Sequence, residues 1–257
     1  MELFLVSIED ILLTFIPVAL ILFLLAYNRN SSKPLVAAGV LFAAFTFDSI
    51  LRNLPIYFSS IYQRLGYWNW EGGILSFLWP WLIIFPFKWL TPEEIGLKLR
   101  KPVKGLLYGL VFGLILGGWN LVDGLFLTDL PSKNIVESIA FQFIVPAFSE
   151  ELVFRGLFLA ILDLYLGKQW IRNSFSFGWG IIIVSILFIC VHLISFDRTT
   201  AQLIWTGSIN LFLNITIATT ALAYLRLKTD SIWPGVICHS LINTMPTLGA
   251  YFLLGRT

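Results

Sequence analysis

The sequence predicts an all-α fold, a polytopic transmembrane helical bundle of about eight spans. Two observations support this prediction. The first is composition: of the 257 residues, 58% are hydrophobic and 12% are charged, and the mean hydropathy is +0.84, far outside the range of soluble domains. The second is the length of the apolar runs, because about 20 apolar residues are needed to cross a bilayer. We therefore expect an integral, multi-pass membrane protein, placed in the cell membrane if its source is prokaryotic.

Eight apolar runs are long enough to cross a membrane, and each is predicted to form one span. They lie near residues 11–27, 34–51, 73–90, 105–127, 135–166, 177–196, 202–226 and 233–254. The basic residues, Arg52 among them, are assigned to the loops between these runs. No internal repeat and no long linker divides the chain, so residues 1–257 are predicted to form a single integral-membrane domain. The net charge of +2 does not indicate a nucleic-acid partner, and the lipid bilayer is the expected surrounding.

The stretch 148–156 places two carboxylates and a guanidinium inside the fifth apolar run. Each such charge costs about 2.5–3.5 kcal/mol at mid-bilayer, so three of them within six positions need an explanation. Glu151 and Arg155 are four residues apart on one helix face, and we expect them to neutralise each other and to orient the helix. Glu150 lies about 100° around the helix and has no local partner. Pro146, four residues earlier, predicts a kink that admits water, where a carboxylate can stay ionised.

The chain has two histidines, His192 and His239, and both fall within apolar runs. A lone intramembrane histidine is more often a hydrogen-bonding residue than a catalyst. His239 and Asn243, however, are four residues apart and can point two donors at one spot. Burying these groups separately would cost more than gathering them around shared water. We therefore expect Glu150, His192, His239 and Asn243 to converge around a water-sized space.

Three short motifs follow one another on separate runs. They are Glu150-Glu151-x-x-x-Arg155, Phe188-x-x-x-His192 and His239-x-x-x-Asn243. In this order they resemble the CPBP intramembrane proteases, a family that includes the type II CAAX prenyl endopeptidases and the Abi-type bacteriocin-immunity proteins. The stretch 225–235 also resembles the family's lead-in to its last motif. The resemblance covers about residues 140–245, which are expected to carry the protease-like core.

The resemblance implies hydrolysis of a peptide bond inside the bilayer, with a peptide or a lipidated protein as substrate. Glu150 is then the general base on a water molecule that His192 shares. His239 and Asn243 are the donors to the oxyanion of the tetrahedral intermediate. No serine or cysteine lies in a recognisable nucleophile setting, so we expect no covalent intermediate.

Two alternatives accompany this interpretation. The family is commonly labelled metalloprotease, and Glu150, His192 and His239 would supply the three ligands that catalytic zinc prefers. The chain has no HExxH helix, and the His239–Asn243 pair suits an oxyanion better, so we favour water without a required cofactor and keep zinc open. The second alternative is a non-catalytic membrane protein that uses the polar site for binding, immunity or transport.

The run boundaries conflict with convergence of the two histidines. His192 lies about 6 Å from one end of its run, and His239 lies about 9 Å from the opposite membrane face. Either the boundaries are displaced, or the turn at 197–200 dips into a hydrated cavity, or the segment 202–226 is not a plain crossing.

Overall fold

The structure is a computed structural model that describes residues 2–57, 66–87, 89–99, 102–124, 134–168, 170–172, 175–197, 202–205 and 208–254. Over these residues its regular elements are helices apart from two short antiparallel hairpins, which confirms the predicted all-α class. The helices are α1 (Glu2–Arg29), α2 (Lys33–Tyr57), α4 (Trp70–Phe87), α5 (Pro102–Gly124), α6 (Ile135–Glu150), η1 (Glu151–Phe158), α7 (Leu159–Leu166), α8 (Trp179–Leu193), α9 (Ile209–Thr229) and α10 (Trp233–Leu254). The hairpins are β1 (Trp170–Arg172) with β2 (Phe175–Phe177) and β3 (Ile194–Asp197) with β4 (Gln202–Trp205).

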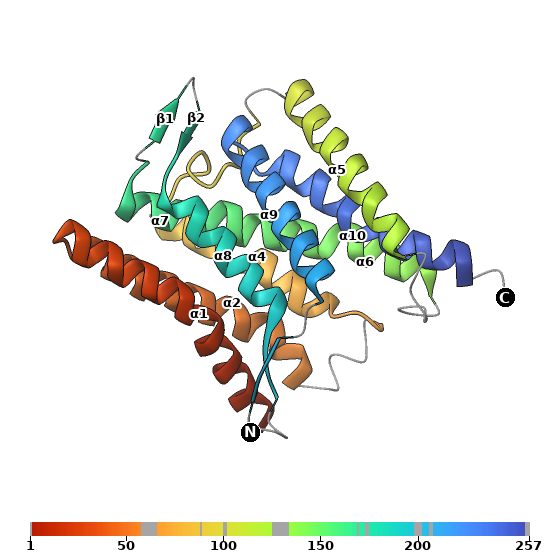
Figure 1. The fold of residues 1–257 in the computed structure, drawn as a ribbon, viewed down its shortest axis with the longest axis horizontal. Coiled ribbons are helices and arrows are strands. Elements are labelled where there is room, and N and C mark those ends of the chain that lie inside the picture. The colour runs from red at the N-terminus through yellow and green to blue at the C-terminus, as the bar shows by residue number, and fades with distance from the viewer. Residues whose placement is uncertain are drawn as a thin grey trace.

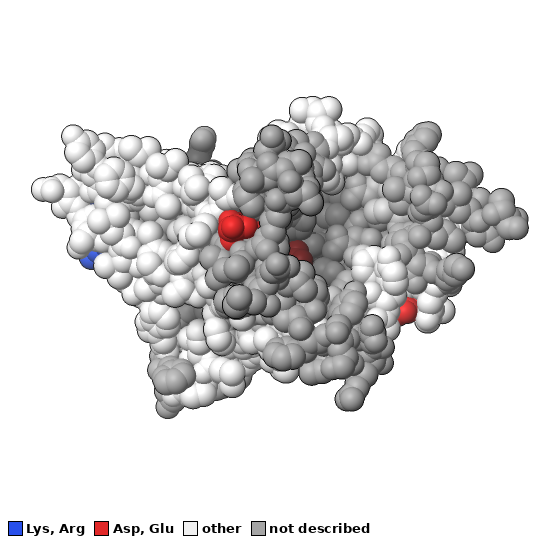
Figure 2. All heavy atoms as spheres, turned by 90° about the horizontal axis from the view of Figure 1, so that it is seen from below, with Lys and Arg blue, Asp and Glu red and all other residues white. Residues whose placement is uncertain are grey.

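The predicted apolar runs overlap these helices, and the fifth run corresponds to α6, η1 and α7 placed end to end. Four described helices are long and apolar enough to cross a membrane, at Glu9–Arg29, Lys33–Pro55, Pro102–Val122 and Ile209–Thr229. Trp70–Ile84 and Trp179–Leu193 are apolar but shorter. On the face shown in Figure 2 most of the described surface is uncharged, as lipid contact requires. The chain is an integral membrane protein.

The start of the seventh run was predicted wrongly. Residues 202–205 form β4, whose register with β3 runs from Ile194 opposite Trp205 to Asp197 opposite Gln202. Helix α9 begins only at Ile209, because the side chain of Ser208 caps it by accepting a hydrogen bond from the Leu211 backbone N–H at 3.2 Å. The segment 202–226 is therefore not a plain crossing.

The helix formed by α6, η1 and α7 crosses the middle of the molecule. Figure 1 shows α1, α2 and α4 on one side of it and α5 and α10 on the other, with α8 and α9 lying in front. Every residue of η1 is buried, and its apolar members belong to the main core cluster. Arg155 is the largest fully buried side chain in the described residues. The motif stretch thus lies at the centre of the bundle.

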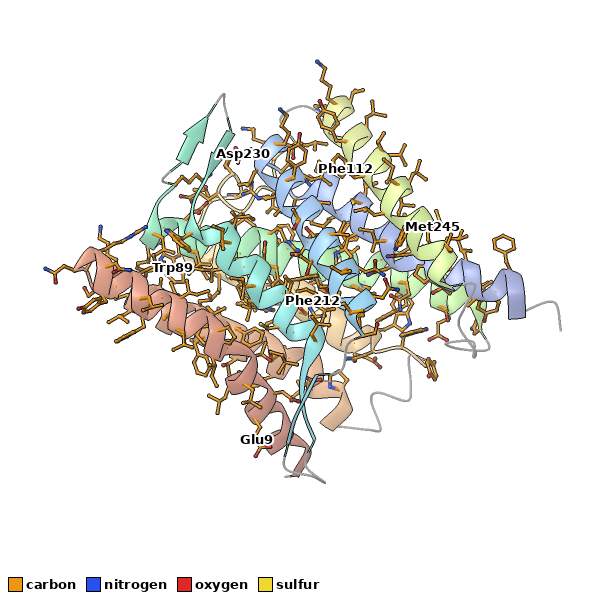
Figure 3. All side chains as sticks on the ribbon, viewed as in Figure 1. Glu9, Trp89, Phe112, Phe212, Asp230 and Met245 are labelled. Atoms are coloured by element: carbon orange, nitrogen blue, oxygen red, sulfur yellow. The ribbon has the colours of Figure 1, made fainter. Side chains whose placement is uncertain are left out.

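A row of glycines on α5 faces α10. A Cβ atom added to Gly113 would lie 3.0 Å from the Cα of Cys238, and one added to Gly117 would lie 2.9 Å from the Cγ of Met245, which Figure 3 labels. At Gly109 the added Cβ would collide with the backbone of Pro234. Small residues at this spacing let two membrane helices approach backbone to backbone. The position of α10 is therefore fixed by direct contact with α5.

Candidate active site

The helix is irregular where the motif begins. Glu150 is the last residue of α6, and the next residue starts η1, an eight-residue π-helix. Wide π turns are uncommon and are often found at functional sites. The carbonyl oxygen of Arg155, inside η1, accepts a hydrogen bond from Arg226 Nε of α9 at 3.0 Å. Pro146 lies in α6, five residues before the π-helix, so the irregularity is close to where the sequence indicated it.

The predicted ion pair between Glu151 and Arg155 is present. Arg155 Nη1 lies 3.1 Å from Glu151 Oε1, and both side chains are 0% exposed. Arg155 also donates from Nη2 to Thr219 Oγ1 of α9 at 2.6 Å. Its guanidinium carbon lies 4.0 Å from the centre of the Phe188 ring, a cation–π contact. The buried guanidinium of Arg155 therefore contacts its own helix and two neighbouring helices, α8 and α9.

Glu150 receives a partner that sequence reasoning missed. Arg52 Nη1 of α2 donates to Glu150 Oε1 at 3.1 Å. The assignment of Arg52 to a loop is wrong because α2 continues to Tyr57, beyond the predicted end of its run at residue 51. The signal that could have revealed it is Asp48, four residues earlier on the same helix face.

The two histidines face the other oxygen of Glu150. His192 Nε2 lies 3.9 Å and His239 Nε2 lies 3.8 Å from Glu150 Oε2. His192 Nδ1 lies 2.8 Å from the carbonyl oxygen of Phe188, and His239 Nδ1 lies 3.0 Å from Glu151 Oε1. A carbonyl or carboxylate oxygen only accepts, so this network assigns the hydrogen of each ring to Nδ1. Each Nε2 therefore turns towards Glu150.

The ring of Phe188 holds these groups at fixed distances from one another. Its centre lies 4.4 Å from that of the His192 ring, one helical turn later, and 6.0 Å from that of the His239 ring. The same ring also contacts the guanidinium of Arg155. The phenylalanine of the Phe-x-x-x-His motif thus packs between the two imidazoles and the buried charge pair.

Two cavities meet at the histidines. The polar chamber, of about 370 Å³, is lined by Arg52 of α2, by Asn69 just before α4, and by residues of α4 and α6 that include Gln142 and Glu150. The apolar chamber, of about 440 Å³, is lined mainly by residues of α8, α9 and α10 such as Leu211, Ile215 and Leu222. Both chambers are also lined by Gln142, His192, His239 and Asn243. These four residues therefore form the boundary between a polar and an apolar space.

A third cavity, of about 340 Å³, continues the apolar chamber outwards between α5 and α9. The two share Asn120 and Asn214, and Trp119 Nε1 donates to Asn214 Oδ1 at 3.1 Å at this border. Trp119 and Ile115, which line the outer cavity, are 62% and 66% exposed on the surface of the bundle. The three cavities form a series from the exposed apolar side chains of α5 to Glu150.

The structure brings the four residues expected to converge to one place. Glu150, His192 and His239 meet at a single carboxylate oxygen, and Asn243 lines both chambers beside the two rings. His192 is near the end of α8 and His239 is near the start of α10, yet both rings reach the same carboxylate oxygen, so the expected separation of the two histidines is not present. Cys190 and Cys238, the neighbours of the motifs, are buried free thiols.

A catalytic zinc ion needs three protein ligands in a suitable arrangement. Among the described residues no group of three or more histidine, cysteine, aspartate or glutamate side chains is arranged to hold a metal. In addition, each glutamate of the motif already has a guanidinium at 3.1 Å, from Arg52 and Arg155. A divalent cation would meet this positive charge at close range. The part of the chain that the structure describes therefore does not fit a zinc site.

These features define an integral membrane protein with carboxylates, imidazoles and an amide gathered around a cavity inside its helical bundle. Residues 132–245 match the model of the family described as Type II CAAX prenyl endopeptidase Rce1-like. The match contains all three motifs, so the predicted resemblance is confirmed for this part of the chain, and it supports a CAAX-protease-like endopeptidase at the level of the family. No curated protein and no solved structure matches the chain.

Proposed function

We propose that this protein is an intramembrane endopeptidase that hydrolyses a peptide bond with a water molecule activated by Glu150. The observation that carries the proposal is the approach of two imidazole Nε2 atoms to the same oxygen of Glu150, at 3.8 and 3.9 Å. These distances are too long for direct hydrogen bonds and leave room for one bridging water. A water in that position has a carboxylate to take its proton and an imidazole to share it.

The chemical steps need only these side chains and water. The water oxygen attacks the scissile carbonyl carbon while its proton passes to Glu150, and His192 orients the water for this attack. The resulting tetrahedral oxyanion accepts hydrogen bonds from His239 and Asn243. The carbon–nitrogen bond then breaks as the proton held by Glu150 moves to the leaving amine, so the products are a new carboxylate and a new amine.

His239 has a defined orientation for this role. Its Nδ1 hydrogen is directed to Glu151 Oε1 at 3.0 Å, so a second proton on Nε2 makes that atom a donor to the oxyanion. Arg155 holds Glu151 in turn through the buried ion pair. Glu151 and Arg155 are thus supporting residues, one step removed from the reacting atoms.

The cavities support a substrate that is presented from the bilayer. The series of spaces between α5 and α9 begins at exposed apolar side chains and ends at the histidines. An apolar or lipidated segment can occupy the apolar chamber while its backbone reaches the polar chamber. The substrate class is therefore a membrane-embedded peptide or a lipidated protein.

The proposal is tested by product formation in liposomes. The wild-type chain is expected to release a cleaved product from a membrane peptide substrate, and Glu150→Gln is expected to reduce the rate by about 10²–10⁴-fold, because the amide cannot take a proton. Glu93→Gln is the matched control, since Glu93 is an exposed carboxylate whose partner is Lys98 on the surface. Cleavage by Glu150→Gln at the wild-type rate would show that Glu150 is not the base.

A further inference from the structure

A second polar cluster, outside the segment 132–245, reaches the site from α2 and α4. It consists of Asp48 and Arg52 on α2 and Ser76 and Trp79 on α4. Arg52 contacts two members of this cluster and Glu150 at once: Nη1 donates to Glu150 Oε1 at 3.1 Å, Nη2 donates to Ser76 Oγ at 3.0 Å, and Nε lies 3.8 Å from Asp48 Oδ2. The planar guanidinium is thereby fixed on three edges.

Asp48, the member of this cluster on the side away from Glu150, is buried, and its Oδ1 accepts two hydrogen bonds. That oxygen accepts from Ser76 Oγ at 2.6 Å and from Trp79 Nε1 at 2.7 Å, and Asp48 is 3% exposed. An aspartate held in this way has little freedom to move. Because Arg52 is tied to this anchor, the position of its Nη1 is set by α2 and α4 rather than by Glu150.

The close packing of α4 supports the same geometry. A Cβ atom added to Gly73 would collide with Val145 of α6, and one added to Gly72 would collide with the backbone oxygen of Arg52. The two glycines therefore bring α4 against both α2 and α6, within reach of the site. Asn69 adds a hydrogen bond from Nδ2 to the same Arg52 backbone oxygen at 2.8 Å.

From these contacts we infer that Arg52, anchored by Asp48 and Ser76, is a positioning residue that fixes the Glu150 carboxylate by its Oε1 and leaves Oε2 aimed at the histidines and the bridging water. Glu150 is the last residue before the π-helix. Because Arg52 holds only Oε1, its hydrogen bond determines that Oε2 is the oxygen that faces the cavity. The inference rests on the proposed function and assigns part of its site to a region that the family match does not include.

The first test separates turnover from binding. Arg52→Gln is expected to lower kcat about 100-fold with little change in KM, because the base is misplaced while the substrate-binding surfaces of the apolar chamber are intact. Arg52→Lys keeps the charge but not the three-edged contact, so it is expected to lose less activity than Arg52→Gln. Arg29→Gln is the matched control: Arg29 ends α1, its Nη1 donates to the Leu166 backbone oxygen at 3.3 Å, and we expect wild-type kinetics.

The second test separates positioning from a merely structural ion pair. If Arg52 serves only to neutralise Asp48, then adding Asp48→Asn to Arg52→Gln restores thermal stability and kcat together. If Arg52 positions Glu150, the double variant recovers part of the melting temperature but kcat stays low. Recovery of wild-type kcat in the double variant, or wild-type kcat in Arg52→Gln, would overturn the inference.

A third measurement does not depend on proteolysis. The infrared difference between wild type and Glu150→Gln isolates the carboxylate band of Glu150, and this band is sensitive to its hydrogen-bond donors. Arg52→Gln is expected to displace the band, and Arg29→Gln is expected to leave it in place. An unchanged band in Arg52→Gln would refute the contact between Arg52 and Glu150, whether or not the wild-type chain is active. An inactive wild-type chain with a displaced band would instead contradict the proposed function alone.

Discussion

His239 Nδ1 lies 3.0 Å from Glu151 Oε1, the same oxygen to which Arg155 donates at 3.1 Å. One carboxylate oxygen thus links the imidazole of α10 to the guanidinium of η1. Because Glu151 is 0% exposed, water does not compete for either contact. The orientation of the His239 ring therefore depends on a buried ion pair that does not itself touch the cavity.

The first prediction concerns this pair. Arg155→Met leaves the charge of Glu151 buried without its cation, so we expect it to lower the free energy of unfolding by about 3–5 kcal/mol. Adding Glu151→Gln removes the stranded charge and should recover part of that loss. Proteolysis should not recover, because His239 has lost its anionic partner. Melting curves in detergent, read together with activity, measure both effects, and a double variant as unstable as Arg155→Met alone would show that the two side chains are not energetically coupled.

A second prediction concerns the proposed oxyanion donor on α10. Asn243→Ala is expected to lower kcat by about 10²–10³-fold with little change in thermal stability, as is typical when one oxyanion donor is removed. The control is Asn28→Ala, because Asn28 is exposed near the end of α1 and lines none of the cavities described above. Steady-state kinetics of the two variants measure kcat, and an equal decrease of kcat in both would contradict a specific role for Asn243.

The third prediction concerns metal dependence. The motif glutamates are each paired with an arginine, and the described residues do not offer a metal site. We therefore expect peptidase activity to be unchanged by EDTA and by 1,10-phenanthroline at concentrations that strip zinc proteins. Loss of activity with chelator, followed by its return on adding zinc, would show that the site takes a metal after all.

The fourth prediction tests the packing of α5 against α10. Gly109→Ala is expected to destabilise the protein by about 1–3 kcal/mol, because its new methyl group collides with the backbone of Pro234 and neither backbone can move away easily. Gly118→Ala on the same helix is the matched control, since its Cβ would have no neighbour within 4 Å. Detergent melting temperatures should fall for the first variant and stay level for the second.

Much of the fold could be predicted from composition and run length. Apolar runs of about 20 residues specify helices because the bilayer leaves the backbone no other way to satisfy its hydrogen bonds. The boundary at 202 was wrong because β4 is as apolar as a helical segment, and hydropathy does not separate the two. The start of α9 depended on the cap at Ser208, a local signal within a long apolar stretch.

The candidate site was predicted in part. The spacing of the charges on one helix predicted the Glu151–Arg155 pair. The cost of burying polar groups separately predicted that Glu150 meets the histidines. Arg52 was missed because its contact with Glu150 joins residues 98 positions apart, and no local pattern encodes that distance. The π-helix at Glu151 was also beyond prediction, since the widened turn depends on packing around it rather than on its own residues.

The glycine row on α5 has a consequence for where the working unit of this protein begins. Helix α10 carries His239 and Asn243, yet the surface against which it rests is α5, and α5 precedes the segment 132–245. If that segment were moved into another membrane protein, it would bring the reacting side chains but not α5, the helix that fixes the position of α10. A slip of α10 by one helical turn, about 5.4 Å, would move both donors out of reach of Glu150. The smallest part of the chain that can hold the site in place therefore includes α5, which precedes the three motifs.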